Sequence, residues 1–202
     1  MRSWTDSTFV FISANPRHDV GGVEDRWFDV MAELIRLGAN VRFLCLMDSP
    51  AGERARALGA HVDPYILDKW NIVRSRSRLR KYLKRYVPVA AHSTGLEADL
   101  LLRWAARKVP SVETVHTVAA DPQGTRRRRP MDALMRRFDE VGMKSAAAVV
   151  VDTDATRLEV VLAGVDAGRI VTEPSGEGST RRSVKMHLEL YRKLMARRGE
   201  GG

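Results

Sequence analysis

The chain has 202 residues, of which 44% are hydrophobic, so it can bury the core of one sizeable domain and is not expected to be disordered as a whole. Its single cysteine, Cys45, excludes a disulfide bond within the chain, and no group of histidines and cysteines has zinc-ligand spacing. The net charge of +9 suggests an anionic partner (phosphate, an acidic lipid surface or nucleic acid), with a generally arginine-rich composition as the plain alternative.

The first half of the chain alternates apolar runs with helical periodicity. Residues 1–11 contain no long apolar stretch after a basic start, so we expect neither a signal peptide nor a membrane span, and a cytoplasmic location follows. The predicted elements are a strand at 9–12, a helix at 26–38, a strand at 41–47, a helix at 50–58, a weak strand at 61–62 and a basic helix, continuous or broken, at 67–86.

The second half continues the alternation. The predicted elements are a strand at 89–92, a helix at 95–108, a strand within 109–118, a helix at 131–138, a strand at 146–151, a helix at 154–163, a strand at 170–171 and a terminal helix at 184–195, after which we expect fraying from Arg197. Such alternation favours parallel βαβ units, so we predict an α/β fold with a doubly wound, mostly parallel sheet.

Ligands of such sheets lie beyond the carboxyl ends of the strands, and several polar residues fall there. Gly21 and Gly22 follow the first strand, where free amides at a helix start attract phosphate, although a plain tight turn is the alternative. Two predicted strands are each followed by a histidine and a hydroxyl residue: His92-Ser93 and His116-Thr117. We expect both histidines to project at the same edge of the sheet, with a structural role as the alternative.

The basic helix has two distinct faces. Arg74, Arg78, Lys81 and Arg85 follow 4-3-4 spacing and share one face, which predicts contact with an anionic bilayer. The apolar counterpart consists of Leu79, Tyr82, Leu83 and Tyr86. The alternative is a solvated outer helix whose apolar face packs on the sheet.

Taken together, the segments resemble the acceptor-side, N-terminal domain of family 4 glycosyltransferases, over roughly residues 8–176. The segments that carry the resemblance are Gly21-Gly22-Val23-Glu24, residues 36–43, residues 91–95 (Ala-His-Ser-Thr-Gly), Thr114-Val115-His116-Thr117, residues 149–153, residues 163–171 and Pro174-Ser175-Gly176. Residues 187–194 are similar to the final helix of the family, which crosses back to the first domain.

The resemblance implies a Rossmann-like half of the GT-B fold, in which two such domains flank a cleft. The N-terminal domain mainly binds the acceptor, and the C-terminal domain binds the nucleotide-sugar donor. By resemblance His116 would be catalytic and lie near the sugar. The substrate-binding residues implied or predicted at this edge are Gly21, Gly22, His92, Ser93, Thr117 and Asp152.

The chain departs from the family after Gly176, where 26 residues remain instead of a second domain. No two glutamates have the seven-residue separation that is usual in the donor domain. We therefore expect a half-domain at 7–176, a linker and a C-terminal helix packed back on it at 177–198, and a disordered tail at 199–202.

Three functions follow from this organisation. The first is the acceptor-binding half of a split glycosyltransferase, which needs a separate donor-domain protein and takes a nucleotide sugar as co-substrate. The second is a non-catalytic domain that binds a sugar, a lipid phosphate or a protein. The third, least favoured because no nucleic-acid-binding motif is present, is a basic nucleic-acid binder. We expect no cofactor and no metal, a sugar or lipid-linked acceptor, a homodimer where no donor partner binds, and peripheral attachment to the inner face of the membrane.

Overall fold

The computed structural model describes residues 3–13, 23–45, 49–64, 72–118, 143–176 and 178–200. The strands are β1 (Thr8–Ser13), β2 (Asn40–Cys45), β3 (His61–Pro64), β4 (Ala90–Thr94), β5 (Glu113–Val118), β6 (Ala148–Val151) and β7 (Ile170–Thr172). The α-helices are α1 (Val23–Arg36), α2 (Pro50–Ala57), α3 (Ile72–Tyr86), α4 (Leu96–Ala106), α6 (Asp154–Leu162) and α7 (Ser179–Glu200). Two short 3-10 helices cover Trp4–Asp6 and Ala167–Arg169.

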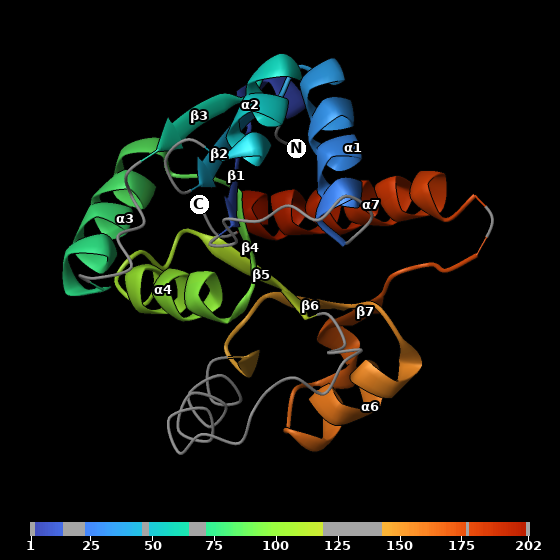
Figure 1. Cartoon of the computed structure of the whole chain (residues 1–202). Helices are drawn as coiled ribbons and strands as arrows, with labels where there is room; N and C mark the ends of the chain where they lie inside the picture. Colours follow the sequence, from blue (N-terminus) through green and yellow to red (C-terminus); the bar gives the residue numbers. More distant parts are fainter. Residues whose placement is uncertain are drawn as a thin grey trace.

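The strands form one seven-stranded sheet in the order β3-β2-β1-β4-β5-β6-β7, and all neighbouring strands are parallel (Figure 1). The predicted doubly wound α/β fold is therefore confirmed. The sheet is covered on both faces, which explains why five of the six residues in each of β1 and β2 are buried, with no alternation of buried and exposed positions.

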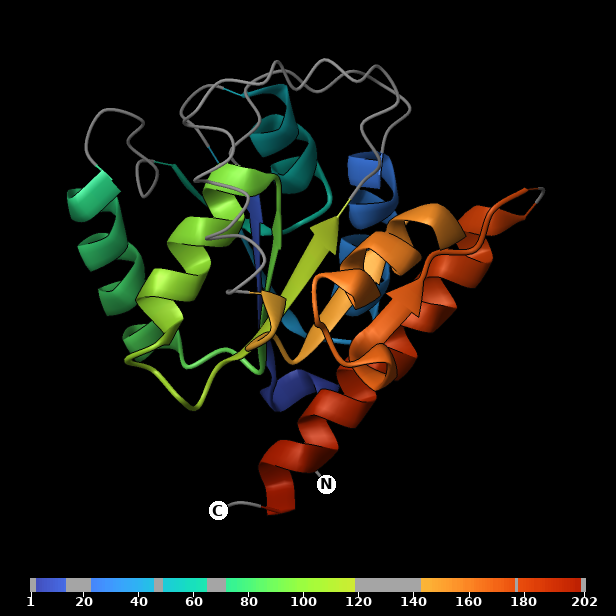
Figure 2. The same cartoon turned by 90° about the horizontal axis from the view of Figure 1, so that it is seen from below.

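One face of the sheet packs against α1, α2 and α7. Phe9, Phe11 and Phe43 from the strands meet Trp27 of α1 and Tyr191 of α7 in this layer. The opposite face carries Val10, Ile12, Leu44 and Ala91 and packs against α3 and α4, while Val149 and Val151 pack against α6. Figure 2 shows α7 as a long helix that runs across the body of the domain.

Local capping chemistry explains several helix boundaries. Ser49 accepts a hydrogen bond from the Gly52 amide and is followed by Pro50, a favourable residue for a first helical turn. Thr153 caps α6 in the same way, because its hydroxyl accepts a hydrogen bond from the Thr156 amide. Gly38 follows α1 with a φ of +85°, and a Cβ there would lie 2.8 Å from Thr5, so glycine is required.

The observed elements follow the predicted order and differ mainly at their ends. The weak third strand is longer than expected, and α7 begins before the predicted residue 184. It also continues to Glu200, beyond the point where we expected the chain to fray, and Arg198 donates to the carbonyl oxygens of Val87 and Pro88. The predicted helix at 131–138 and the first residues of the basic helix lie outside the described residues.

Candidate functional site

The carboxyl ends of β4 and β5 bring four of the predicted site residues together. His92, Ser93, His116 and Thr117 are all buried, with exposed fractions of 3% or less. Ser93 lies beside His116 in the register of the two strands, and Thr94 lies beside Thr117. Because strand side chains alternate, Ser93 and His116 point to the α4 face, whereas His92 and Thr117 point to the α7 face. The two histidines were expected to follow their strands, but both lie inside β4 and β5, on opposite faces of the sheet, and they do not converge on one site.

On the α4 face, His116 belongs to a polar group that we call the Ser93 cluster (Ser93, Asp99, Arg103 and His116). The Ser93 hydroxyl donates to Asp99 Oδ1 at 2.5 Å and lies 2.8 Å from His116 Nδ1. Arg103 Nε donates to His116 Nε2 at 3.4 Å, so Nε2 is an acceptor and the ring hydrogen lies on Nδ1, which is 3.1 Å from Asp99 Oδ1.

The Ser93 cluster contains the residue types of a nucleophile, a base and an orienting acid. Nucleophilic catalysis requires the nucleophile to reach a substrate, however, and Ser93 and His116 are 0% exposed while Asp99 is 4% exposed. In the described structure the cluster therefore acts as a buried brace between β4, β5 and α4. The catalytic role that the resemblance implies for His116 stays a prediction.

On the α7 face, His92 lies in a second group, the His92 cluster (His92, Thr117 and Tyr191). His92 Nδ1 is 2.7 Å from the Tyr191 hydroxyl, and His92 Nε2 is 2.7 Å from Thr117 Oγ1. The Trp27 ring packs on the imidazole with 4.6 Å between ring centroids. Burial, with His187 nearby, holds the pKa of His92 well below its usual range, and burial raises the pKa of Tyr191. His92 is therefore a neutral core residue that links the sheet to α7.

A buried ionic group fixes the start of α7. Glu173 follows β7 directly, and its carboxylate accepts a hydrogen bond from Arg26 of α1. The Ser183 hydroxyl donates to the same carboxylate at 3.2 Å, and His187 Nε2 lies 3.8 Å from Glu173 Oε1. His187 Nδ1 lies 3.0 Å from the Ser183 carbonyl, so it donates there, and burial lowers the pKa of this histidine. We call these four residues the Glu173 anchor.

The other predicted substrate-binding residues have different outcomes. Asp152 is partly buried and lies directly before Thr153, the cap of α6, and its carboxylate accepts a hydrogen bond from Thr156 Oγ1 at 2.9 Å. Gly21 and Gly22 lie outside the described residues. Within the part of the chain that the structure describes, no group of three or more His, Cys, Asp or Glu side chains could hold a metal ion.

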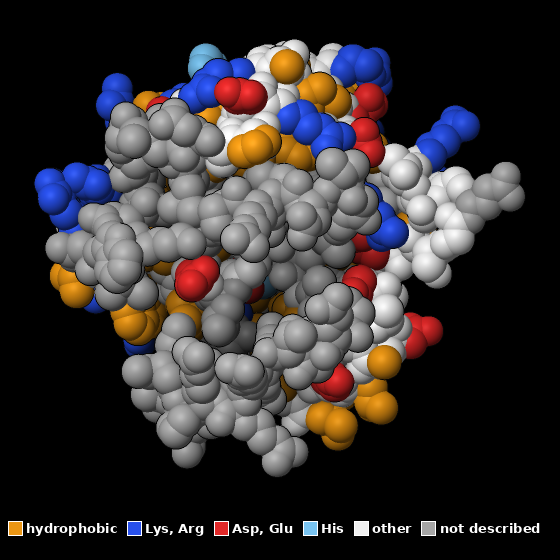
Figure 3. All heavy atoms as spheres, in the orientation of Figure 1, with side chains coloured by type: hydrophobic (Ala, Val, Ile, Leu, Met, Phe, Trp, Pro, Cys, Tyr) orange, Lys and Arg blue, Asp and Glu red, His pale blue; other side chains and the backbone are white. Residues whose placement is uncertain are grey.

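The basic helix separates its two faces as the spacing predicts. Leu79 and Leu83 are fully buried in the apolar core that α3 and α4 form with one face of the sheet. On the other side of the helix, Arg74, Lys81 and Arg85 are exposed and Arg78 is partly exposed. Lysine and arginine side chains gather over this part of the surface (Figure 3). The apolar face thus packs as the alternative interpretation expected, and the basic face stays open to solvent. Among the described residues, no helix combines the length and the hydrophobicity needed to cross a bilayer.

Sequence reasoning missed the partners that hold the histidines. Asp99 and Arg103 of α4, Glu173 after β7 and the pair His187 and Tyr191 of α7 were not singled out. One signal was available for the last pair, because a histidine and a tyrosine four residues apart on the apolar face of a helix are neighbours that must share a buried polar environment.

The chain matches the family model described as Glycosyltransferase Family 4 over residues 20–176. Its fold is similar to HepE from Anabaena in complex with UDP, with a TM-score of 0.65 and 11% identity, covering 84% of this chain and 44% of that one. It is also similar to a glycosyltransferase from Rickettsia africae, with a TM-score of 0.61 and 15% identity, covering 84% of this chain and 43% of that one. Among proteins with curated functions, none matches the chain in sequence.

The chain thus spans less than half the length of these two structures. A third similar structure, the sucrose-phosphate synthase fragment designated 27_220_406_426 from Thermosynechococcus elongatus, is matched over 99% of its length and 94% of this chain, with a TM-score of 0.60 and 13% identity. At these identities the likeness concerns the fold, which is that of one Rossmann-like half of a GT-B structure.

Proposed function

Because the chain belongs to glycosyltransferase family 4, we propose that it is the acceptor-binding half of a GT-B glycosyltransferase. In this proposal a separate donor-domain protein holds the nucleotide sugar, and the carboxyl edge of the sheet described above holds a sugar or lipid-linked acceptor. Glycosyl transfer needs the leaving diphosphate to be stabilised by preorganised cations and amides. We assign that task to the partner, which would close over the edge formed by β1, β4, β5 and β6.

The observation that carries the proposal is the return of α7 to the first helix directly after β7. The Glu173 anchor ties the end of β7 to both α1 and α7, and the His92 cluster ties α7 to the middle of the sheet. The similarity to a fragment of nearly the same extent supports a half-domain that folds as a unit of this kind. The partial coverage of the two longer structures supports a chain that corresponds to about half of such an enzyme.

UDP-glucose is the first donor to test, because HepE was solved in complex with it. The purified chain would be incubated with UDP-glucose and a membrane extract as the acceptor source, alone and together with the donor-domain protein that co-purifies from native cells. We expect UDP release only when both proteins are present, and the donor-domain protein alone is the control. Release by the chain alone, at a rate that the second protein does not change, would contradict the split arrangement.

A second candidate function, binding without catalysis, is favoured by the engagement of both histidines inside the protein. Every ring nitrogen of His92 and His116 has a buried partner, which leaves neither imidazole for proton transfer without rearrangement. Acceptor binding by the chain, measured by calorimetry, combined with no turnover in any mixture with donor proteins, would select this function over the first.

We further propose a cytoplasmic protein that attaches peripherally to the inner face of the membrane. The exposed basic face of α3 supports this location, since each basic residue near an anionic bilayer contributes roughly 1 kcal/mol. A membrane-bound acceptor half would hold a lipid-linked acceptor close to its own surface.

A further inference from the structure

Exposed apolar side chains form a stripe along α6. Leu158, Val161 and Leu162 are 60%, 37% and 78% exposed, whereas Thr156 and Val160 on the opposite side of the helix are buried. The spacing of three and four residues places the exposed side chains on one face, which we call the α6 stripe. Figure 3 shows hydrophobic side chains open to solvent over α6. Clustered exposed apolar residues of this kind mark interaction surfaces more often than isolated ones do.

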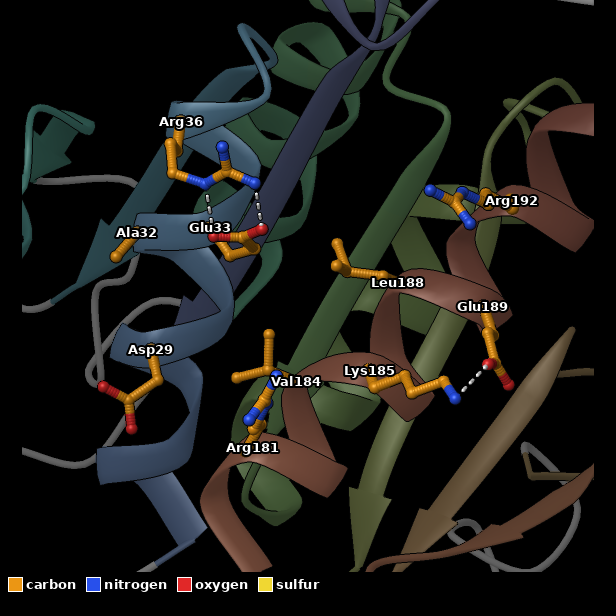
Figure 4. A pocket seen from close by; sticks show the side chains of 10 residues that line it. All are labelled: Asp29, Ala32, Glu33, Arg36, Arg181, Val184, Lys185, Leu188, Glu189 and Arg192. Atoms are coloured by element: carbon orange, nitrogen blue, oxygen red, sulfur yellow. Dashed lines mark hydrogen bonds and ion pairs between the residues drawn. The ribbon is translucent and has the colours of Figure 1, made fainter. Parts of the chain in front are cut away.

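A groove of about 630 Å³ lies between α1 and α7, on the outer surface of the helical layer (Figure 4). Its floor is apolar and consists of Ala32 from α1 and Val184 and Leu188 from α7. In Figure 4, Val184 and Leu188 point from α7 toward α1. Each of the three is only partly buried, so a further apolar side chain in the groove would gain contact with all of them.

The two walls of the groove carry opposite net charge. The α1 wall has two carboxylates, Asp29 and Glu33, and one guanidinium, Arg36, which is bonded to Glu33 at 2.6 and 2.8 Å. The α7 wall has three cations and one carboxylate: Arg181, Lys185, Arg192 and Glu189. The Lys185–Glu189 pair, at 3.9 Å, partly neutralises this wall. An occupant with an apolar ridge, a basic flank toward α1 and an acidic flank toward α7 would complement the groove.

The α6 stripe has these three features. Arg157 and Glu159 stand one residue before and one residue after Leu158, so they lie about 100° around the helix on opposite flanks of the stripe. We propose that α6 of one copy of this chain docks in the α1–α7 groove of a second copy. Leu158 and Leu162 rest on the floor of the groove, Arg157 faces the acidic α1 wall and Glu159 faces the basic α7 wall.

The contact joins two different surfaces, so it is heterologous. The α6 stripe faces away from the sheet against which Val160 packs, and a chain cannot turn it into its own groove. Repetition of a heterologous contact gives a ring where the rotation closes and an open chain where it does not. The contact of one helix with one groove falls at the low end of interface size, below about 1,200 Å². The association is therefore weak, and the fraction of associated chains rises with protein concentration.

Sedimentation velocity over a range of protein concentrations tests the proposal. We expect the average mass of the wild-type chain to rise with concentration. Leu162→Glu removes the stripe and Ala32→Arg fills the groove, and each variant should keep the monomer mass. Neither change removes a buried contact, and thermal unfolding checks that both variants are folded. Val73→Glu, which changes a side chain that is 72% exposed on α3, is the matched control and should associate like the wild type.

Mixing the two variants is the decisive measurement. The Ala32→Arg chain still carries an intact α6 stripe, and the Leu162→Glu chain still carries an intact groove, so an equimolar mixture should form a complex of one copy of each. The proposal is overturned by a wild-type chain that stays monomeric, by an Ala32→Arg variant that associates like the wild type, by loss of association in the control, or by a mixture that stays monomeric.

Discussion

The Tyr191 hydroxyl lies 2.7 Å from His92 Nδ1, and this bond joins the last helix to the central strand β4 across the buried layer of the domain. Both residues are essentially inaccessible to solvent, at 0% and 1%. A buried hydrogen bond contributes modestly to the free energy of unfolding. Removal of one partner costs more than this contribution, because the remaining buried group cannot form a hydrogen bond with water instead. The position of α7 is thus coupled to the ring that holds Thr117 at the carboxyl edge.

Replacement of this hydroxyl gives the first prediction. We expect Tyr191→Phe to lower the free energy of unfolding by about 1–3 kcal/mol, because the His92 nitrogen keeps its desolvation without a partner. Urea denaturation measures the change. Tyr86→Phe is the control, since the Tyr86 ring packs under Arg42 at 3.7 Å and should keep that contact without its hydroxyl. Equal losses in the two variants would show that the bond to His92 contributes nothing specific.

The second prediction concerns the Glu173 anchor. Glu173→Gln should lower the free energy of unfolding by roughly 3 kcal/mol, the lower limit for breaking a buried ion pair, because the Arg26 side chain is still 28% exposed and can be partly hydrated. Glu189→Gln removes a carboxylate from the exposed pair with Lys185 and should change stability by less than about 1 kcal/mol. Chemical denaturation of both variants compares the pairs directly. Similar small losses would mean that Glu173 does not anchor α7.

Acid sensitivity gives the third prediction. His92 and His187 are both buried, and burial lowers the pKa of each below its ordinary value of about 6.5. Just below pH 6.5, the two histidines therefore bind protons in the unfolded chain but stay neutral in the folded chain. This contribution to stability is complete above pH ~6.5 and is lost as the pH falls toward the folded-state pKa values, by up to about 1.4 kcal/mol per pH unit for each histidine.

Denaturation at pH 7.5 and 5.5 measures this loss, and His187→Gln should show a smaller difference between the two values than the wild type. His61→Gln is the control, because His61 is an exposed residue at the edge strand β3. If His187→Gln and the wild type lose the same free energy on acidification, His187 is not among the groups that set the acid limit.

The sheet could be predicted from sequence because its strands are buried on both faces and read as continuous apolar runs, such as Phe9–Ile12 and Ala148–Val151. Glycines near helix ends, such as Gly38, coincide with predicted helix boundaries. The ends of α7 were harder to predict, because its first turns are polar and are held by the long-range Glu173 anchor instead of by local periodicity.

The partners of the candidate site could not be predicted in the same way. His92 and His116 were expected to follow their strands, but they lie inside β4 and β5. The faces to which their side chains point depend on strand register, which a single apolar run does not reveal. Asp99 and Arg103 lie in a helix whose orientation over the sheet is a tertiary property. The sequence therefore indicated which strands carry the polar groups, and the structure shows that His92 and His116 form hydrogen bonds with buried partners inside the domain.

The fourth prediction tests the basic face of α3. Replacement of Arg74, Arg78, Lys81 and Arg85 by serine should weaken binding to vesicles of phosphatidylserine and phosphatidylcholine by on the order of 10²–10³-fold, since each basic residue contributes roughly 1 kcal/mol at an anionic surface. Co-sedimentation with vesicles at low salt measures the partition coefficient. Leu79 and Leu83 remain in place in the variant, so the packing of α3 is retained.

The matched control removes the same number of charges from α7, by replacing the exposed residues Arg181, Lys185, Lys193 and Arg197 with serine. This variant has the same net charge as the α3 variant, so a purely global attraction would weaken both equally. Stronger binding of the wild-type chain to arbitrary DNA than to the vesicles, lost equally in both variants, would instead favour a nucleic-acid partner. If the surface selects lipid, the loss of binding should be confined to the α3 variant, because the four cations of α3 share one helical face opposite the buried Leu79 and Leu83.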